Sequence, residues 1–100
     1  MSENLGTGGS KSALNLTAAT LVSATNSNSY APRRVSRISV LVAGSTAGSI
    51  NDSATIAGAS ASNQVFSIPN VVGSYWVDFP CLAGIVVTPG TGQTVAVSYD

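Results

Sequence analysis

The sequence predicts a small all-β protein, an antiparallel β-sandwich or jelly-roll of about seven or eight short strands. Short β-type runs recur at intervals of roughly 8–12 residues, and proline and glycine separate them. No segment has the 3.6-residue periodicity of a helix, so we expect almost none; residues 57–61, rich in alanine, are the one place for a helical turn. A chain of 100 residues suits a single domain.

The first thirty residues differ in composition from the rest. Met1–Ser12 is polar and rich in glycine, so we expect an extended arm that a partner orders, with Leu5 as its only sizeable apolar anchor. Leucines and a valine between Leu14 and Val22 indicate one strand, and residues 25–29 a polar loop. We therefore divide the chain into residues 1–29, with the arm, first strand and loop, and a sandwich domain over residues 30–100.

The strongest strand is predicted over Arg34–Ala43. Alternation along it places two groups on opposite faces: Ile38, Val40 and Val42 on one, and Val35, Arg37, Ser39 and Leu41 on the other. A glycine-containing break follows, then a short strand over Ser49–Ile56 and a low-complexity loop over residues 57–63.

Four further strands complete the predicted sandwich. Gln64–Ile68 is stopped by Pro69, and Gly73–Phe79 is stopped by Pro80. On the second of these, Trp76 shares a face with Ser74 and Asp78, while Tyr75, Val77 and Phe79 take the other face. Residues 84–88 and 94–99, joined by a loop with proline and glycine, are predicted to form a terminal hairpin.

Charge is unusually scarce in this chain. Only 8% of the residues are charged and the formal net charge is zero, whereas about a quarter are charged in an ordinary soluble domain. Such a surface resists self-association poorly, so we expect a homo-oligomer, with a trimer favoured, that works within an assembly. Four Lys and Arg residues are too few to hold nucleic acid or an anionic membrane, and we expect neither as a partner.

The residue types needed for common catalytic sites are missing or scattered. Without histidine, Ser-His-Asp, Cys-His and His-based zinc sites are excluded. Asp52 and Asp78 are the one carboxylate pair within the predicted sandwich, but no motif supports a catalytic or Ca²⁺ site there. Cys81 stands in an apolar stretch and is predicted to be a buried, inert thiol. We therefore predict a protein that is not an enzyme and has no cofactor or metal.

A small set of residues is predicted to contact partner proteins. The arginines are the only charge cluster and could reach a partner's carboxylates, although a solvated strand edge that discourages aggregation explains them equally well. Trp76 is interpreted as a core or interface anchor, with a sugar platform as the alternative. The predicted partner-binding residues are Leu5, Lys11, Leu14, Tyr30, Arg33, Arg34, Arg37 and Trp76.

From Tyr30 onward the order of motifs resembles small virion proteins of tailed bacteriophages. The matching pieces are RVSRISVLVAG, GSIND, SNQVFSIP and WVDFPCLAGIVVTPGTGQTVAVSY, and the most specific part runs from Phe79 through Pro89 to Gly92. The resemblance implies a β-sandwich head or tail component with no catalytic residues. It does not extend to the first thirty residues.

These expectations favour a capsid cement or decoration protein that binds at junctions of major capsid subunits or other virion subunits. Its expected location is the virion, assembled in the host cytoplasm. The alternative is a receptor- or glycan-binding module of a phage fibre or tail, for which Trp76 and Tyr75 would have to lie exposed beside Asn or Asp. A non-viral bacterial surface domain is disfavoured, because the first residues of the sequence do not resemble an export signal.

Overall fold

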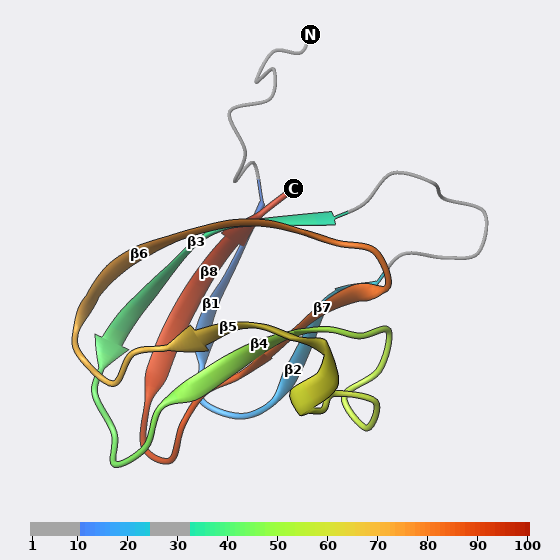
Figure 1. Cartoon of the computed structure of the whole chain (residues 1–100). Helices are drawn as coiled ribbons and strands as arrows, with labels where there is room; N and C mark the ends of the chain where they lie inside the picture. The colour runs from blue at the N-terminus through green and yellow to red at the C-terminus, as the bar shows by residue number, and fades with distance from the viewer. Residues whose placement is uncertain (1–10, 25–32) are drawn as a thin grey trace, which may run out of the picture.

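The computed structural model describes residues 11–24 and 33–100. This part of the chain forms two four-stranded antiparallel sheets that pack face to face (Figure 1). Sheet A has the strand order β1-β8-β3-β6 and sheet B the order β2-β7-β4-β5. The predicted sandwich of short strands is confirmed. Its elements are β1 (Lys11–Leu16), β2 (Thr20–Ala24), β3 (Arg33–Val42), β4 (Gly48–Asp52), the 3₁₀ helix η1 (Ala61–Asn63), β5 (Gln64–Ile68), β6 (Gly73–Cys81), β7 (Gly84–Thr88) and β8 (Thr94–Tyr99).

The strands pair as in a long hairpin that has been wrapped into two layers. The first strand pairs with the last, β2 with β7, β3 with β6, and β4 with β5. Further pairing of β3 with β8 joins two of these pairs into sheet A, and pairing of β4 with β7 joins the other two into sheet B. Among the connections that the described residues include, only β4–β5 joins two strands of the same sheet. Each of the others leads from one sheet to the other, which is the jelly-roll arrangement.

The predicted terminal hairpin is wrong, although both of its strands have the predicted bounds. β7 lies in sheet B between β2 and β4, whereas β8 lies in sheet A between β1 and β3. The loop between them crosses the end of the sandwich and packs on the β3–β4 connection. A Cβ on Gly44 would collide with the carbonyl oxygen of Thr91, and one on Gly90 with that of Thr46. Close backbone packing thus holds the crossing loop in place.

Residues 11–24 contain two strands where one was predicted. β1 is an edge strand of sheet A and β2 an edge strand of sheet B, so Leu14 and Leu21 lie in different layers. The predicted arm is shorter than expected, because Lys11 and Ser12 already pair with Tyr99 and Ser98 of β8. The rest of the arm, with Leu5, and the predicted loop over residues 25–29 lie outside the described residues.

A β-bulge changes the predicted faces of β3. Two residues of β6, Val77 and Asp78, oppose the single residue Ser36, and Ser36 is itself an extra residue relative to β8. As a result Val35 is buried with Ile38 in the core, although it was predicted to share the face of Arg37. Arg37 points outward. A bulge shifts the alternation by one position, which a strict two-residue pattern cannot anticipate.

Two strand ends also differ from the prediction. β6 continues through Pro80 to Cys81, because β6 is an edge strand and Pro80 needs no partner for its missing N–H on the open side. β4 stops at Asp52 rather than Ile56, since the Ser53 hydroxyl donates to the carbonyl of Thr55 at 2.7 Å and turns the chain. The only helical turn in the described part is η1, which begins at Ala61, the last residue of the alanine-rich stretch.

The core fills the space between the sheets with aliphatic side chains. Val35, Ile38 and Val40 of β3 meet Ile50, Ile85 and Val87 of sheet B there, and the free thiol of Cys81 joins them. Their side chains are almost completely removed from water. Burial of this kind contributes roughly 1.5–3 kcal/mol for each large aliphatic side chain, so the core is the main stabilising element of the sandwich.

Candidate functional site

Part of the outer face of sheet B is covered by the chain itself. On β4, the amide of Asn51 points to this side and donates to the carbonyl of Ser60 at 2.8 Å and to Oδ1 of Asn63 at 2.9 Å. Its register partner Val86 is fully buried, yet lies outside the core cluster between the sheets. The segment with η1 therefore covers the part of sheet B around Asn51 and Val86, whereas Leu21 on β2, the other register partner of Val86, remains exposed.

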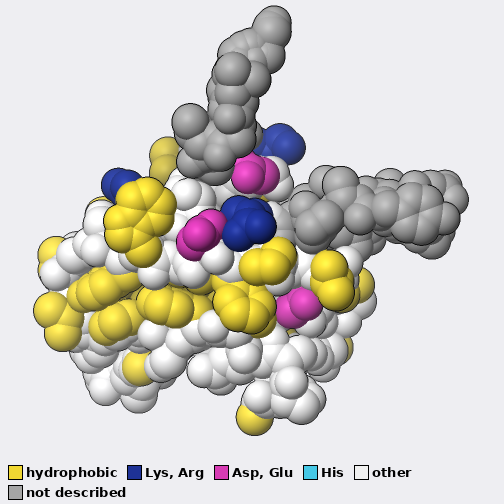
Figure 2. Space-filling model, turned by 45° about the horizontal axis from the view of Figure 1, so that its top comes forward, with side chains coloured by type: hydrophobic (Ala, Val, Ile, Leu, Met, Phe, Trp, Pro, Cys, Tyr) yellow, Lys and Arg dark blue, Asp and Glu magenta, His cyan; other side chains and the backbone are white. Residues whose placement is uncertain are grey.

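The outer face of sheet A is open over residues 11–24 and 33–100. Two large apolar side chains stand on it near opposite edges: Leu14 on β1 is 69% exposed and Trp76 on β6 is 67% exposed. Small residues lie between them on the central strands, where Ala96 pairs with Ser39. A separate row of apolar side chains, with few charged side chains beside it, is visible in the space-filling view of Figure 2.

A second bulge explains why Leu14 is exposed. Ala13 pairs with Val97 and Leu16 with Val95, so Leu14 and Asn15 together oppose Ala96. Asn15 takes a left-handed conformation with φ of 57°. Without the extra residue Leu14 and Leu16 would share one face, but here Leu16 is buried in the core and Leu14 faces solvent. The bulge thus places a leucine on the outer face of sheet A.

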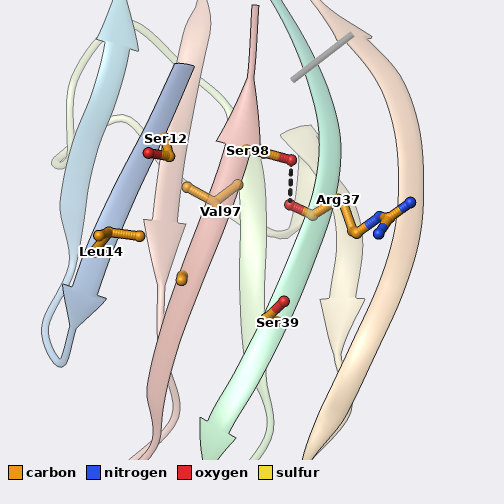
Figure 3. Close-up of a pocket in the computed structure, with 7 residues that line it drawn as sticks. Ser12, Leu14, Arg37, Ser39, Val97 and Ser98 are labelled. Carbon is orange, nitrogen blue, oxygen red and sulfur yellow. Dashed lines mark hydrogen bonds between the residues drawn. The ribbon is translucent and has the colours of Figure 1, made fainter. Parts of the chain in front are cut away.

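A shallow hollow of about 120 Å³ lies beside Leu14 (Figure 3). Small side chains of β8 and β3 form its floor, and Arg37 borders it on the far side from Leu14. The hydroxyl of Ser98 donates to the carbonyl of Arg37 at 3.5 Å. The complete lining is Ser12, Leu14, Arg37, Ser39, Ala96, Val97 and Ser98. Its size and carbon-rich wall suit one small apolar group.

The side chain of Arg37 points away from the hollow, toward β6 (Figure 3). Its guanidinium carbon lies 4.1 Å from the centroid of the Trp76 ring, which is a cation–π contact. The contact restricts the guanidinium, while Arg37 as a whole remains exposed to solvent. Trp76 is on the outer face with Ser74, as predicted, whereas Tyr75 and Val77 pack against the core.

The other arginine whose side chain is described has a carboxylate partner. Nη1 of Arg34 lies 3.0 Å from Oδ1 of Asp78; the side chain of Asp78 is largely exposed and that of Arg34 is partly exposed. β3 is an interior strand of sheet A, so the interpretation of these arginines as protection for a sheet edge is wrong. The edge beside them is β6, where the bulge at Asp78, with φ of 46°, and Pro80 interrupt regular pairing.

The structure brings three of the predicted partner-binding residues together. Leu14, Arg37 and Trp76 come from three strands and form one band across the outer face of sheet A, which we call the Leu14–Trp76 band. Lys11 begins the same edge strand as Leu14, and Arg34 is on β3. Arg33 is the first residue of β3, and Leu5 and Tyr30 lie outside the described residues.

Sequence reasoning missed the small residues that make the hollow. Ser39, Ala96 and Ser98 have no feature that distinguishes them from other surface residues. Their only signal is that they occupy the polar positions of two strongly predicted strands. Which strands are neighbours must be known before these positions can be combined into one site.

The two candidate carboxylates have structural roles in different places. On β4, Asp52 accepts hydrogen bonds from the backbone N–H groups of Leu82, Ala83 and Gly84, at 3.0, 2.7 and 3.3 Å. Asp78 pairs with Arg34 on the other sheet. Among the described residues no group of three His, Cys, Asp or Glu side chains could hold a metal ion.

Cys81 is buried, as predicted, and its environment disfavours the thiolate. Burial raises the pKa of its thiol to about 11, and the nearby negative charge of Asp52 adds to the effect. A nucleophilic cysteine needs the opposite arrangement, with a depressed pKa and access to solvent.

The described part of the chain contains no helix long and apolar enough to cross a membrane. No family model, no curated protein and no solved structure matches the sequence or its fold. The Leu14–Trp76 band is therefore interpreted from its own geometry.

Proposed function

We propose that the chain is a non-enzymatic structural protein of a virus particle, acting as a capsid decoration or cement protein. In this role it binds where major capsid subunits meet and stabilises the shell by adding buried apolar area at each junction. Support comes from the exposed surface and from the sequence resemblance, because a jelly-roll fold alone is compatible with many functions.

The observation that carries the proposal is the amount of apolar side chain left at the surface. A chain with four basic and four acidic residues exposes many large hydrophobic side chains, a surface suited to protein contacts. Most are on strands or short turns, so little conformational freedom is lost when they are covered. The exposed set is Leu14, Leu21, Leu41, Val42, Ile56, Val71, Val72, Trp76, Phe79 and Leu82.

The test compares particles of the encoding virus with and without this chain. We expect particles that lack it to lose integrity at a lower temperature and at low ionic strength, because each junction has less buried area. Adding the purified chain back should restore the stability of complete particles. Equal survival of the two particle types would contradict a cementing role.

One observation favours a second function, that of a glycan-binding module of a fibre or tail. The ring of Trp76 is exposed and lies beside the hydroxyls of Ser74 and Ser39, which are 2.8 Å apart. Aromatic rings next to hydrogen-bonding groups suit sugar rings, but Arg37 already covers one face of this ring. A glycan-array or cell-adsorption assay compares the natural chain with the Trp76→Ala variant. Unchanged binding by the variant would contradict a glycan-binding function.

A further inference from the structure

The Leu14–Trp76 band offers two different subsites side by side. On one side is the hollow beside Leu14, lined mainly by aliphatic carbon and small hydroxyl groups. On the other is the guanidinium of Arg37, whose carbon lies over the Trp76 ring. The hollow lies over β8 and the guanidinium over β6, so they are about two strand spacings apart, roughly 10 Å.

The hollow is suited to an aliphatic side chain rather than to a sugar. Its volume of about 120 Å³ fits a leucine- or valine-sized group. Leu14 and Ala96 provide carbon surface, and the hydroxyl of Ser98 is already engaged by the carbonyl of Arg37. A pyranose would leave several of its hydroxyls without partners there, which costs free energy.

Charge indicates what binds at the second subsite. Within the described residues Arg37 contacts an aromatic ring and has no carboxylate partner, whereas Arg34 is neutralised by Asp78. On the strands of sheet A the carboxylate of Asp78 is already paired with Arg34, so a second copy of this face offers no free carboxylate from these strands. The band therefore complements a carboxylate from a different chain, which the flat guanidinium can bind through two N–H groups.

We infer that the outer face of sheet A is the docking site for an extended, acidic segment of a partner protein. An aliphatic side chain of the segment fills the hollow, and a carboxylate two residues further along binds Arg37. Side chains at positions i and i+2 of an extended chain point to the same side about 7 Å apart, and the reach of the glutamate closes the remaining gap. This inference deepens the proposed function and rests on it for the partner's identity as a capsid subunit.

A short peptide tests the inference without the natural partner. The probe is acetyl-Gly-Leu-Ser-Glu-Gly-amide, and binding is followed by the amide spectrum and by fluorescence, since Trp76 is the only tryptophan of the chain. We expect saturable changes at the Trp76 indole and at the Ala96 amide. A probe with Gln in place of Glu should bind about fivefold more weakly, equivalent to roughly 1 kcal/mol for an exposed charge pair.

Variants assign each preference to its subsite. The Arg37→Gln variant should bind the Glu probe and the Gln probe with equal affinity. The Ala96→Val variant, in which the added methyl groups fill the hollow, should bind the original probe no more tightly than a probe in which Gly replaces Leu. Ser67→Val on β5 is the matched control on sheet B and should bind as the natural chain does. The amide spectrum of each variant reports directly whether it is folded.

Three results would overturn the inference: no saturable change at millimolar probe, changes centred away from sheet A, or equal binding of the Glu and Gln probes by the natural chain. Binding of glucuronic acid at Trp76 in place of the peptide would assign the band to acidic sugars instead. If the peptide fails but the chain still stabilises particles, only the docking face is wrong. If the peptide binds but particles are equally stable with and without the chain, only the proposed function is wrong.

Discussion

At the scale of single residues, Asp52 is the polar side chain with the clearest structural role. Its carboxylate accepts hydrogen bonds from the backbone N–H groups of Leu82 and Ala83, in the turn between β6 and β7, and of Gly84, the first residue of β7. It therefore holds the turn that connects sheet A to sheet B. Hydrogen bonds to a charged group contribute about 1.5–3 kcal/mol. We therefore predict that Asp52→Asn lowers the free energy of unfolding by about 2 kcal/mol, measured by urea denaturation.

The matched control is Asp78→Asn, which removes the same charge from an exposed ion pair. The pair between Arg34 and Asp78 has exposed fractions of 43% and 71%, so solvent screens it strongly. We expect a change below about 1 kcal/mol. Equal losses from the two substitutions would mean that the turn does not depend on the carboxylate of Asp52.

Cys81 predicts a pH dependence of stability. Its pKa is raised from 9.0 to about 11 in the folded protein, so between these values the unfolded chain releases a proton that the folded chain keeps. Stability is fully present below pH 9 and is lost as the pH rises toward 11, by about 3 kcal/mol for a shift of this size. The measurement is the free energy of unfolding between pH 8 and 11.

Cys81→Ala provides the comparison, because it removes the titrating group and leaves the tyrosines and lysine in place. Its stability should be lower at pH 8 owing to lost packing, but should fall less steeply toward pH 11. Parallel curves for the two proteins would show that another group governs the alkaline loss.

At the scale of elements, the bulge in β1 determines which leucine faces the solvent. Asn15 holds a φ of 57°, and its side chain is exposed, so its contribution is mainly through the backbone. A non-glycine residue pays about 1–2 kcal/mol in this conformation, and asparagine tolerates it better than most. We predict that Asn15→Ala destabilises the fold by about 1 kcal/mol, measured in urea, whereas Asn15→Gly leaves its stability nearly unchanged.

A loss of stability in the glycine variant as large as in the alanine variant would contradict this explanation. It would indicate that the side chain of Asn15, rather than its backbone conformation, supports the edge strand.

Strands were predictable from this sequence, but their partners were not. The bounds of β5, β7 and β8 agree with the prediction, since each is an apolar run between clear turn residues. β7 and β8 are adjacent in sequence and yet lie in different sheets, because the whole chain folds back so that β8 pairs with β1. Local patterns carry no information on pairing at such long range.

Three residues of the candidate site were predicted from the sequence, but the fact that they lie together on one face was not. The sequence singled out Leu14, Arg37 and Trp76, which the structure places in one band. Two bulges decide that Leu14 and Arg37 face outward, each by shifting the alternation relative to Leu16 and Val35. A bulge depends on the strands on either side, so it does not appear in a two-residue pattern.

At the scale of the whole molecule, the wrapped pairing makes the start of the chain part of the sandwich. β1 covers one edge of β8, and Leu16 at its end is only 9% exposed in the core. The segment that precedes Lys11 is polar and rich in glycine, so its sequence offers little to bury. The boundary that matters for stability is therefore expected at Lys11.

Two truncations locate this boundary. A chain that starts at Lys11 should melt within a few degrees of the full chain, because it keeps all eight described strands. A chain that starts at Thr17 loses β1 and should be destabilised by at least about 2 kcal/mol, since the core leucine is removed and the edge of β8 becomes unpaired. Both are measured by thermal unfolding. If the first truncation also unfolds early, residues before Lys11 belong to the fold; if it is stable but leaves the particle more easily, those residues bind the shell as the arm was predicted to do.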